Sequence, residues 1–189
     1  MDLSIRQPVW LALSDLFLDT DVRLNYPSTA RALAQSPYSD PERQVIFRDE
    51  VAPIVEPNLF EIAGDWAGFP EDWLFATILK RGPQPYRLRS DAGKHLDAVL
   101  ALAHPLRRLS PEAIEARLNT WRVLANLYLY RTPTLPSNLA PDAGTIFRQE
   151  IQPAYCPTAA AYQRHQPAIY PSSEEVEQNW AAWAAVLLP

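Results

Sequence analysis

The sequence predicts an all-α protein, a compact helical fold built from two diverged copies of one motif. First, the 189 residues include 19 prolines and only 5 glycines, which favours short helices with abrupt ends over glycine-dependent hairpins. Second, apolar residues recur at helical spacing, and long alternating β-branched runs are missing. Third, two sequence blocks recur in the same order. An apolar content of 48% is ordinary for a globular chain and too high for a disordered one.

The first helix is expected over residues 8–19, because proline suits a first turn and apolar residues from Trp10 onward share one face. Ser39 and Glu42 have the spacing of a capping box, which predicts a helix that ends near Pro53. Further helices are expected over residues 28–35, 70–79, 90–103, 110–130, 146–151 and 172–188, with loops over 80–89 and 132–141.

Self-similarity is the strongest signal in the chain. The pattern R-x3-W-x2-L-x2-L-F-L begins at Arg6 and recurs from Arg117 with tyrosine in place of phenylalanine. Residues 46–53 match residues 146–153 in the same way. We therefore predict a first helical repeat over 1–79, a linker and connecting helix over 80–109, and a second repeat over 110–189, together forming one globular unit.

Each repeat carries a glutamate on an apolar helix face, Glu50 in the first and Glu150 in the second. A buried carboxylate is costly unless it is paired, and a helix C-terminus disfavours an anion. Arg6 and Arg117, each one turn before a tryptophan, are the natural partners. We predict Arg6–Glu50 and Arg117–Glu150 as structural, charge-assisted ion pairs.

Two other interpretations of these glutamates stay open. Arg48 and Arg148 stand close in sequence and could neutralise the carboxylates instead. Alternatively, Glu50 and Glu150 could work as catalytic acids, with a histidine as the second group. Duplicated scaffold residues are more often structural, so we expect no catalytic residue among them.

The charge is unevenly distributed along the chain. Residues 1–79 hold 13 acids and 5 bases, net −8, whereas residues 80–189 hold 9 acids and 12 bases, net +3. Either the two parts complement each other, or the first part offers an acidic surface to a basic partner.

Positions that differ between the repeats are the better candidates for a specific function. Asp15 and Asp19 stand one helical turn apart, where the second repeat has Asn126 and Tyr130. A second acidic group accompanies tryptophans 66 and 73, and acidic plus aromatic surface suits docking to a basic protein. The plainer alternative is that these acids only solvate helix starts. The candidate partner-binding residues are Asp15, Asp19, Asp21, Asp65, Glu71 and Asp72.

Familiar catalytic chemistry is missing from the sequence. His95, His104 and His165 have no metal-site spacing, and no phosphate-binding or nucleophile motif occurs, so we expect no metal and no cofactor. The single cysteine, Cys156, excludes an internal disulfide and is typical of a reducing compartment. No apolar run approaches the roughly 20 residues of a membrane span, and the N-terminus is unlike a secretory signal. We expect a cytoplasmic protein.

We do not expect nucleic acid to be the partner. Seven bases lie between residues 80 and 108 with Tyr86 among them, a pattern that can follow a phosphate backbone. The net charge of the whole chain is −5, however, which opposes nucleic-acid binding.

Residues 9–20 (V-W-L-A-L-S-D-L-F-L-D-T), 50–53 (E-V-A-P) and 63–69 (A-G-D-W-A-G-F) resemble an uncharacterised bacterial domain family of small stand-alone proteins, a domain of unknown function. The resemblance covers about residues 5–79. It implies a bacterial, cytoplasmic protein and carries no activity. The second repeat departs from the pattern, because A-G-D-W-A-G-F has no counterpart there.

The leading hypothesis is a protein-interaction module, and more specifically an immunity-type protein that binds and occludes a cognate bacterial toxin. Its acidic first half would cover a basic active-site cleft. The alternatives are an enzyme with an unrecognised acid/base site and a structural or regulatory subunit. Small size, acidity and the lack of a catalytic motif favour the protein-interaction module over these alternatives.

Overall fold

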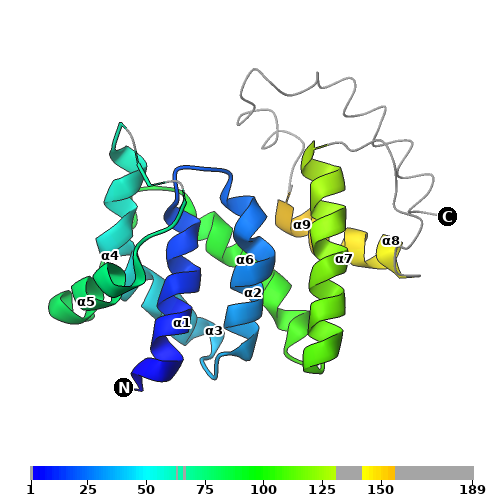
Figure 1. The fold of residues 1–189 in the computed structure, drawn as a ribbon, viewed down its shortest axis with the longest axis horizontal. Coiled ribbons are helices and arrows are strands. Elements are labelled where there is room, and N and C mark those ends of the chain that lie inside the picture. Colours follow the sequence, from blue (N-terminus) through cyan, green and yellow to red (C-terminus); the bar gives the residue numbers. More distant parts are fainter. Residues whose placement is uncertain (1, 63, 66, 131–141, 156–189) are drawn as a thin grey trace. The chain divides into compact units, whose positions relative to one another are not determined.

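The computed structural model describes residues 2–62, 64–65, 67–130 and 142–155, and of residues 126–130 the backbone alone. The chain divides into two compact units, Met1–Leu109 and Ser110–Pro189, which are described separately below. The described residues form helices and no strands, as the all-α prediction requires (Figure 1). The boundary between the units coincides with the predicted start of the second repeat.

The first unit begins with α1 (Leu3–Ser14), followed by the short 3-10 helix η1 (Asp15–Phe17). The Asp2 side chain caps α1 by accepting a hydrogen bond from the Ser4 backbone N–H at 3.0 Å. The helix therefore starts five residues before Pro8, and the prediction that Pro8 opens it is wrong. Pro8 cannot donate to the Ser4 carbonyl, but both residues are exposed, so water can take the place of the missing bond.

The next segment is helical from residue 22 to residue 60 apart from one short turn. It contains η2 (Val22–Asn25), α2 (Tyr26–Gln35), α3 (Asp40–Val45), η3 (Ile46–Val51), α4 (Ala52–Val55) and η4 (Glu56–Phe60), of which η3 is a π-helix. The predicted capping box is confirmed, because Ser39 and Glu42 cap the start of α3 reciprocally.

The helix predicted to end near Pro53 passes this proline and continues to Val55, the last residue of α4. Pro53 has no N–H for the carbonyl of Asp49, four residues earlier. That carbonyl accepts hydrogen bonds from the Gln84 N–H at 3.3 Å and from the Arg81 guanidinium at 3.1 Å. Residues 81 and 84 thus satisfy the Asp49 carbonyl in place of the missing Pro53 N–H, so the helix continues past the proline.

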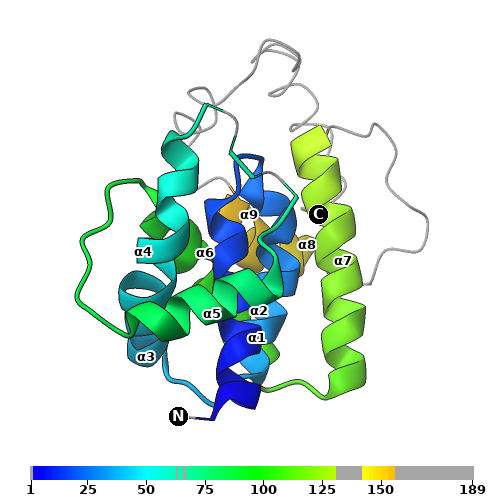
Figure 2. The same ribbon diagram turned by 60° about the vertical axis from the view of Figure 1, so that its left-hand side comes forward.

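The first unit is completed by α5 (Glu71–Arg81) and α6 (Ala92–Leu106). Helix α6 packs against α2, and α5 lies across the outside of α1, with Phe75 against the buried Trp10 ring (Figure 2). Residues 80–109, predicted as a linker and connecting helix, therefore fold as part of the first unit. In the centre of the unit the rings of Phe17 and Phe47 stack with 5.0 Å between centroids.

The described part of the second unit contains α7 (Pro111–Tyr130), α8 (Ala143–Ile146), η5 (Phe147–Ile151) and α9 (Gln152–Tyr155), of which η5 is again a π-helix. Helix α7 has the predicted bounds. The loop predicted over 132–141, the helix predicted over 172–188, Cys156 and His165 lie outside the described residues. That the two units are diverged copies stays a prediction.

Candidate functional site

Arg6, Trp10 and Glu50 meet in the core of the first unit. The Arg6 guanidinium donates to both Glu50 oxygens, with Nε at 3.0 Å from Oε2, and the Trp10 indole N–H donates to Oε2 at 2.7 Å. The guanidinium also lies over the Tyr38 ring, 4.8 Å from its centroid. Burial opposes the charge of Arg6, but the Glu50 carboxylate outweighs it and raises the pKa of the arginine. The predicted Arg6–Glu50 pair is present and bidentate.

Arg117, Trp121 and Glu150 repeat this arrangement in the second unit. Arg117 Nη1 lies 2.7 Å from Glu150 Oε1, and the Trp121 indole N–H donates to Oε2 at 2.6 Å. Arg117 also approaches Asp142, at 3.8 Å. The predicted Arg117–Glu150 pair is therefore present, through one guanidinium nitrogen where Arg6 uses two.

Both glutamates occupy π-helical stretches. A π-helix has more residues per turn than an α-helix and turns more of them toward one side. In η3, Ile46, Phe47, Glu50 and Val51 are all buried, and so is Asp49. The extra acid is neutralised by Arg48, whose Nε and Nη2 each lie 2.7 Å from an Asp49 oxygen. Arg48 thus serves Asp49, and the alternative that it neutralises Glu50 is wrong.

A third buried carboxylate, Glu56, was not predicted. Its side chain is fully buried and accepts from the backbone N–H groups of Arg89 (2.9 Å) and Ser90 (2.8 Å) and from the Tyr86 hydroxyl (2.8 Å). Burial raises the pKa of Glu56, but the hydrogen bonds from Ser90 and Tyr86 outweigh it and hold the pKa below its usual value. Glu56 fastens the segment before α6 to the end of α4.

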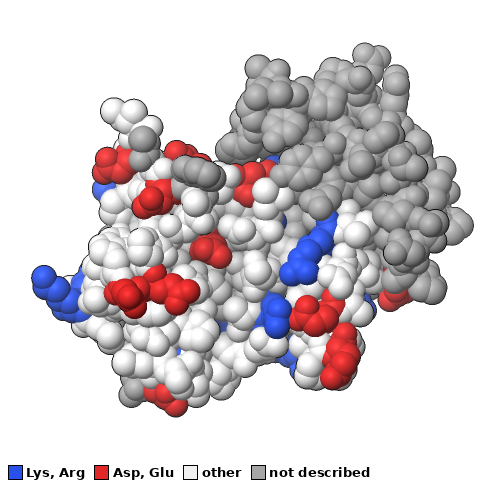
Figure 3. Space-filling model, in the orientation of Figure 1, with Lys and Arg blue, Asp and Glu red and all other residues white. Residues whose placement is uncertain are grey.

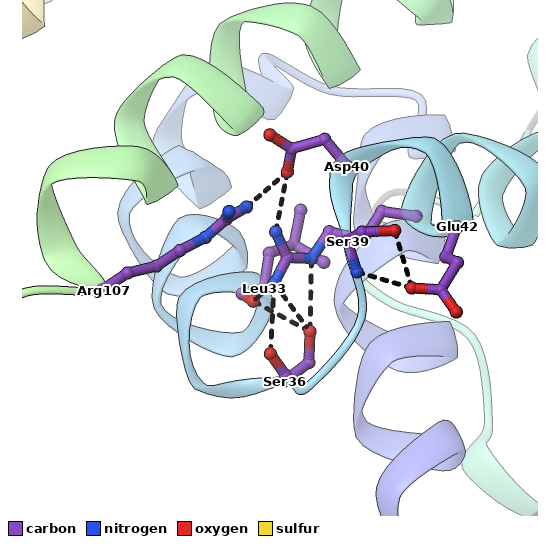
Figure 4. A network of polar contacts seen from close by, with 7 residues as sticks. Leu33, Ser36, Ser39, Asp40, Glu42 and Arg107 are labelled. Atoms are coloured by element: carbon purple, nitrogen blue, oxygen red, sulfur yellow. Dashed lines mark hydrogen bonds and ion pairs between the residues drawn. The ribbon is translucent and has the colours of Figure 1, made fainter.

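Arg43 is buried and was not predicted as a structural residue; Figure 4 shows the polar contacts around it. Its guanidinium donates to the carbonyls of Leu33 and Ser36 at the end of α2 and to Asp40 at 2.7 Å. Asp40 also accepts from Arg107, just beyond α6. One buried arginine therefore satisfies the open carbonyls of α2 and connects them to the neighbouring helices.

Four of the seven bases in the segment 80–108 contact other residues of the first unit: Arg81, Arg89, Lys94 and Arg107. Arg81 donates to the Asp49 carbonyl, Arg89 stacks on the Phe60 ring at 5.0 Å, and Lys94 lies 3.3 Å from Asp91. The first unit as a whole holds 15 acids and 12 bases, net −3. The charge asymmetry along the sequence is thus largely compensated inside this unit, which favours self-complementarity over a phosphate-binding strip.

Two of the acidic candidates, Asp15 and Asp21, are half-buried. Asp21 caps η2 and pairs with Arg23, at 2.7 and 2.6 Å, and this pairing outweighs burial and lowers the pKa of Asp21. Asp15 lies half-buried at the end of α1, where desolvation raises its pKa to about 6. Of Asp15, Asp19 and Asp21, only Asp19 is exposed.

Asp19 and Asp65 are 46 residues apart in sequence but adjacent in space. The Asp19 N–H donates to the Asp65 carbonyl at 2.9 Å. The Asn58 amide accepts from the Asp65 N–H at 2.6 Å and donates to the carbonyls of Phe17 and Asp65, both at 3.0 Å. Sequence reasoning named both aspartates and missed Asn58, which fixes them.

Glu71 and Asp72 form a separate group in the first turn of α5, where both side chains are exposed. Trp73 follows them and stacks on Phe69, with 6.1 Å between centroids. Trp66 lies outside the described residues. Figure 3 shows the acidic side chains on one face of the molecule as several separate groups. Among the predicted acidic residues, Asp19 and Asp65 are joined by a hydrogen bond, whereas Asp15 and Asp21 are half-buried.

The described residues contain no cluster of histidine, cysteine or acidic side chains that could hold a metal ion. Nor do they include a helix with the length and apolar character needed to span a membrane.

Comparison with known proteins gives a family and no relative of known activity. No curated protein and no solved structure matches the chain. The model of a family described as a domain of unknown function, DUF7079, matches residues 4–103, just over half of the chain. The match extends past the predicted limit at residue 79 and includes most of α6, which the fold also assigns to the first unit. The chain belongs to the DUF7079 family.

Proposed function

We propose that this chain is a protein-binding module that takes a basic partner on the tip of the first unit. The tip surface comprises Asp19, Phe60, Glu61, Ile62 and Asp65. The observation that carries the proposal is the exposure of two large apolar side chains among carboxylates: Ile62 is 106% exposed and Phe60 is 56% exposed. Glu61, between them in the chain, is exposed, and so are Asp65, three residues after Ile62, and Asp19, whose N–H donates to the Asp65 carbonyl.

Exposure of Ile62 has a cost that a partner can remove. Burying an isoleucine side chain stabilises by roughly 1.5–3 kcal/mol, and the free protein forgoes this. Arg89 covers one face of the Phe60 ring, whereas Ile62 projects into solvent. An exposed apolar residue with a polar rim is the arrangement that binding hot spots use.

Hydrogen bonds hold the Asp19 and Asp65 backbones of the tip surface in place before any partner binds. Asn58 ties the Asp65 backbone to the end of η1, and Asp19 donates to the same loop. Gly64 is required here, since a Cβ atom at this position would lie 2.6 Å from the Asn58 carbonyl oxygen. Pre-organisation lowers the entropy lost on association, so a small surface can bind specifically.

Three exposed carboxylates select a partner with lysine or arginine side chains, because like charges across an interface cost several kcal/mol. In the more specific form of the proposal the chain is an immunity-type protein, bacterial and cytoplasmic, whose tip covers the basic cleft of a toxin. The alternatives are a regulatory subunit and an enzyme that uses Glu50 or Glu150. Arg6 and Trp10 engage both oxygens of Glu50, which favours a structural role for it.

The test is affinity capture from the producing organism with a tip variant, Asp19→Asn/Ile62→Ser/Asp65→Asn. The control is Asp97→Asn/Glu112→Gln, which also removes two negative charges, but at exposed positions outside the tip surface. We expect one stoichiometric basic protein that binds the parent and the control equally and the tip variant at least about 100-fold more weakly. Equal binding to all three would refute the tip surface. A chain that captures nothing but loses a measurable activity in Glu50→Gln would support the enzyme instead.

A further inference from the structure

Helix α5 has one face in the core and one in solvent. Leu74 and Ile78 are buried, whereas Trp73 is 46% and Leu79 is 45% exposed. Helical spacing places the exposed residues on a common face, opposite the buried Leu74 and Ile78, and Figure 2 shows α5 lying over α1. We name the α5 face by its five exposed members: Asp72, Trp73, Ala76, Leu79 and Lys80.

Charge is ordered along the α5 face. The acid Asp72 lies in the first turn, the base Lys80 lies in the last turn, and apolar residues lie between them. Such a face is self-complementary when a second copy is turned end to end. With the helices antiparallel and the two-fold axis at Ala76, Asp72 of one copy meets Lys80 of the other, and Trp73 meets Leu79.

We infer that the chain forms a symmetric homodimer by antiparallel packing of α5 on α5. The symmetry is that of an isologous interface, in which each contact occurs twice. Alanine at the axis lets the helices approach to the 8–10 Å that helix packing requires. The stacking of Trp73 on Phe69 fixes the largest apolar side chain of the face in advance.

The contact is small, because an 11-residue helix is only about 16 Å long. Interfaces of this size belong to the weak and transient class, so we expect dissociation constants on the order of 10–100 μM. The inference stands independently of the tip surface and needs no other protein.

The register is tested by sedimentation equilibrium of the full chain with two charge variants, Asp72→Lys and Lys80→Asp. Each variant alone places like charges opposite each other and should dimerise at least about tenfold more weakly than the parent. An equimolar mixture pairs lysine with aspartate at both ends, so it should form a heterodimer at parental concentrations. A parent that stays monomeric at several hundred micromolar, or a mixture no more associated than its components, would overturn the inference.

Disulfide trapping gives a second readout that does not depend on charge. In a Cys156→Ser background, Ala76→Cys places two thiols at the axis, whereas Thr77→Cys on the same helix places them off it. Under mild oxidation Ala76→Cys should cross-link to a dimer several times faster than Thr77→Cys. Equal rates would contradict the register. Ile62→Ser should leave both readouts unchanged, and its failure to do so would mean that the tip, not α5, makes the contact.

Discussion

The two arginine–tryptophan–glutamate clusters use the same chemistry at different depths. The Glu50 side chain is 2% exposed and takes two bonds from Arg6, while the Glu150 side chain is 14% exposed and takes one from Arg117. A buried charge pair contributes little by itself but is costly to break, and the cost grows with burial. The comparison therefore teaches that the same three residue types can form a buried core element in one unit, and in the other a more exposed cluster that should lose less stability on substitution.

Removal of the deeper carboxylate should have the largest effect. Glu50→Ala leaves the Arg6 charge and the Trp10 N–H buried without their acceptor, so we expect the free energy of unfolding to fall by about 3–5 kcal/mol. Urea unfolding followed by circular dichroism measures it. Glu61→Ala, a change at an exposed glutamate, should be nearly neutral. An unchanged midpoint for Glu50→Ala would show that the cluster is not structural.

The shallower carboxylate should matter less. Glu150→Ala also leaves a buried indole N–H, that of Trp121, without its acceptor, but the Arg117 side chain is 22% exposed and keeps Asp142 at 3.8 Å as a second anion. We expect a loss of about 1–2 kcal/mol in the same measurement. A loss equal to that of Glu50→Ala would break the comparison and make the two clusters energetically equivalent.

Arginine-to-lysine exchange sharpens the same comparison. Lysine keeps the charge but cannot form a bidentate bond, and it lacks the planar guanidinium that lies over Tyr38. We expect Arg6→Lys to cost about 1–2 kcal/mol and Arg117→Lys less than about 1 kcal/mol. Thermal unfolding of the two variants beside the parent gives the order. The reverse order would mean that the bidentate geometry at Arg6 adds less to stability than the single contact at Arg117.

Both ion pairs were predictable because a carboxylate lies on an apolar helix face and an arginine recurs one turn before each tryptophan, whereas the indole donors Trp10 and Trp121 were not predicted. Glu56 and Arg43 gave no such signal. Their partners are chiefly backbone groups, the N–H of Ser90 and the carbonyl of Leu33, and residue types do not encode where a distant backbone group will lie.

Helix boundaries failed for a related reason. Local rules place prolines at helix starts and stops, but Pro8 lies within α1. Helix α4 continues past Pro53 because Arg81 and Gln84 donate to the Asp49 carbonyl, which the proline cannot serve. The π-helices had no signature beyond the matched blocks in which they occur. Long-range satisfaction of the backbone is what local patterns leave out.

The smallest predicted effect concerns a position at which the two matching sequence segments differ, with Asp15 in the first and Asn126 in the second. Burial raises the pKa of Asp15 from 3.8 to about 6 in the folded chain. Between these values the folded state holds a proton that the unfolded state has released, so stability falls as pH rises from about 4 to about 6. Above this window the buried charge destabilises the fold in full.

Asp15→Asn removes that charge and should therefore stabilise the protein at neutral pH and not in acid. Solvent screens a half-buried group, so we expect a gain of only about 1 kcal/mol at pH 7.5, declining to nearly nothing at pH 4. Thermal unfolding of parent and variant over this pH range measures the difference. A gain that is independent of pH would place its origin in packing, and a loss at pH 7.5 would show that the Asp15 charge has a partner the fold depends on.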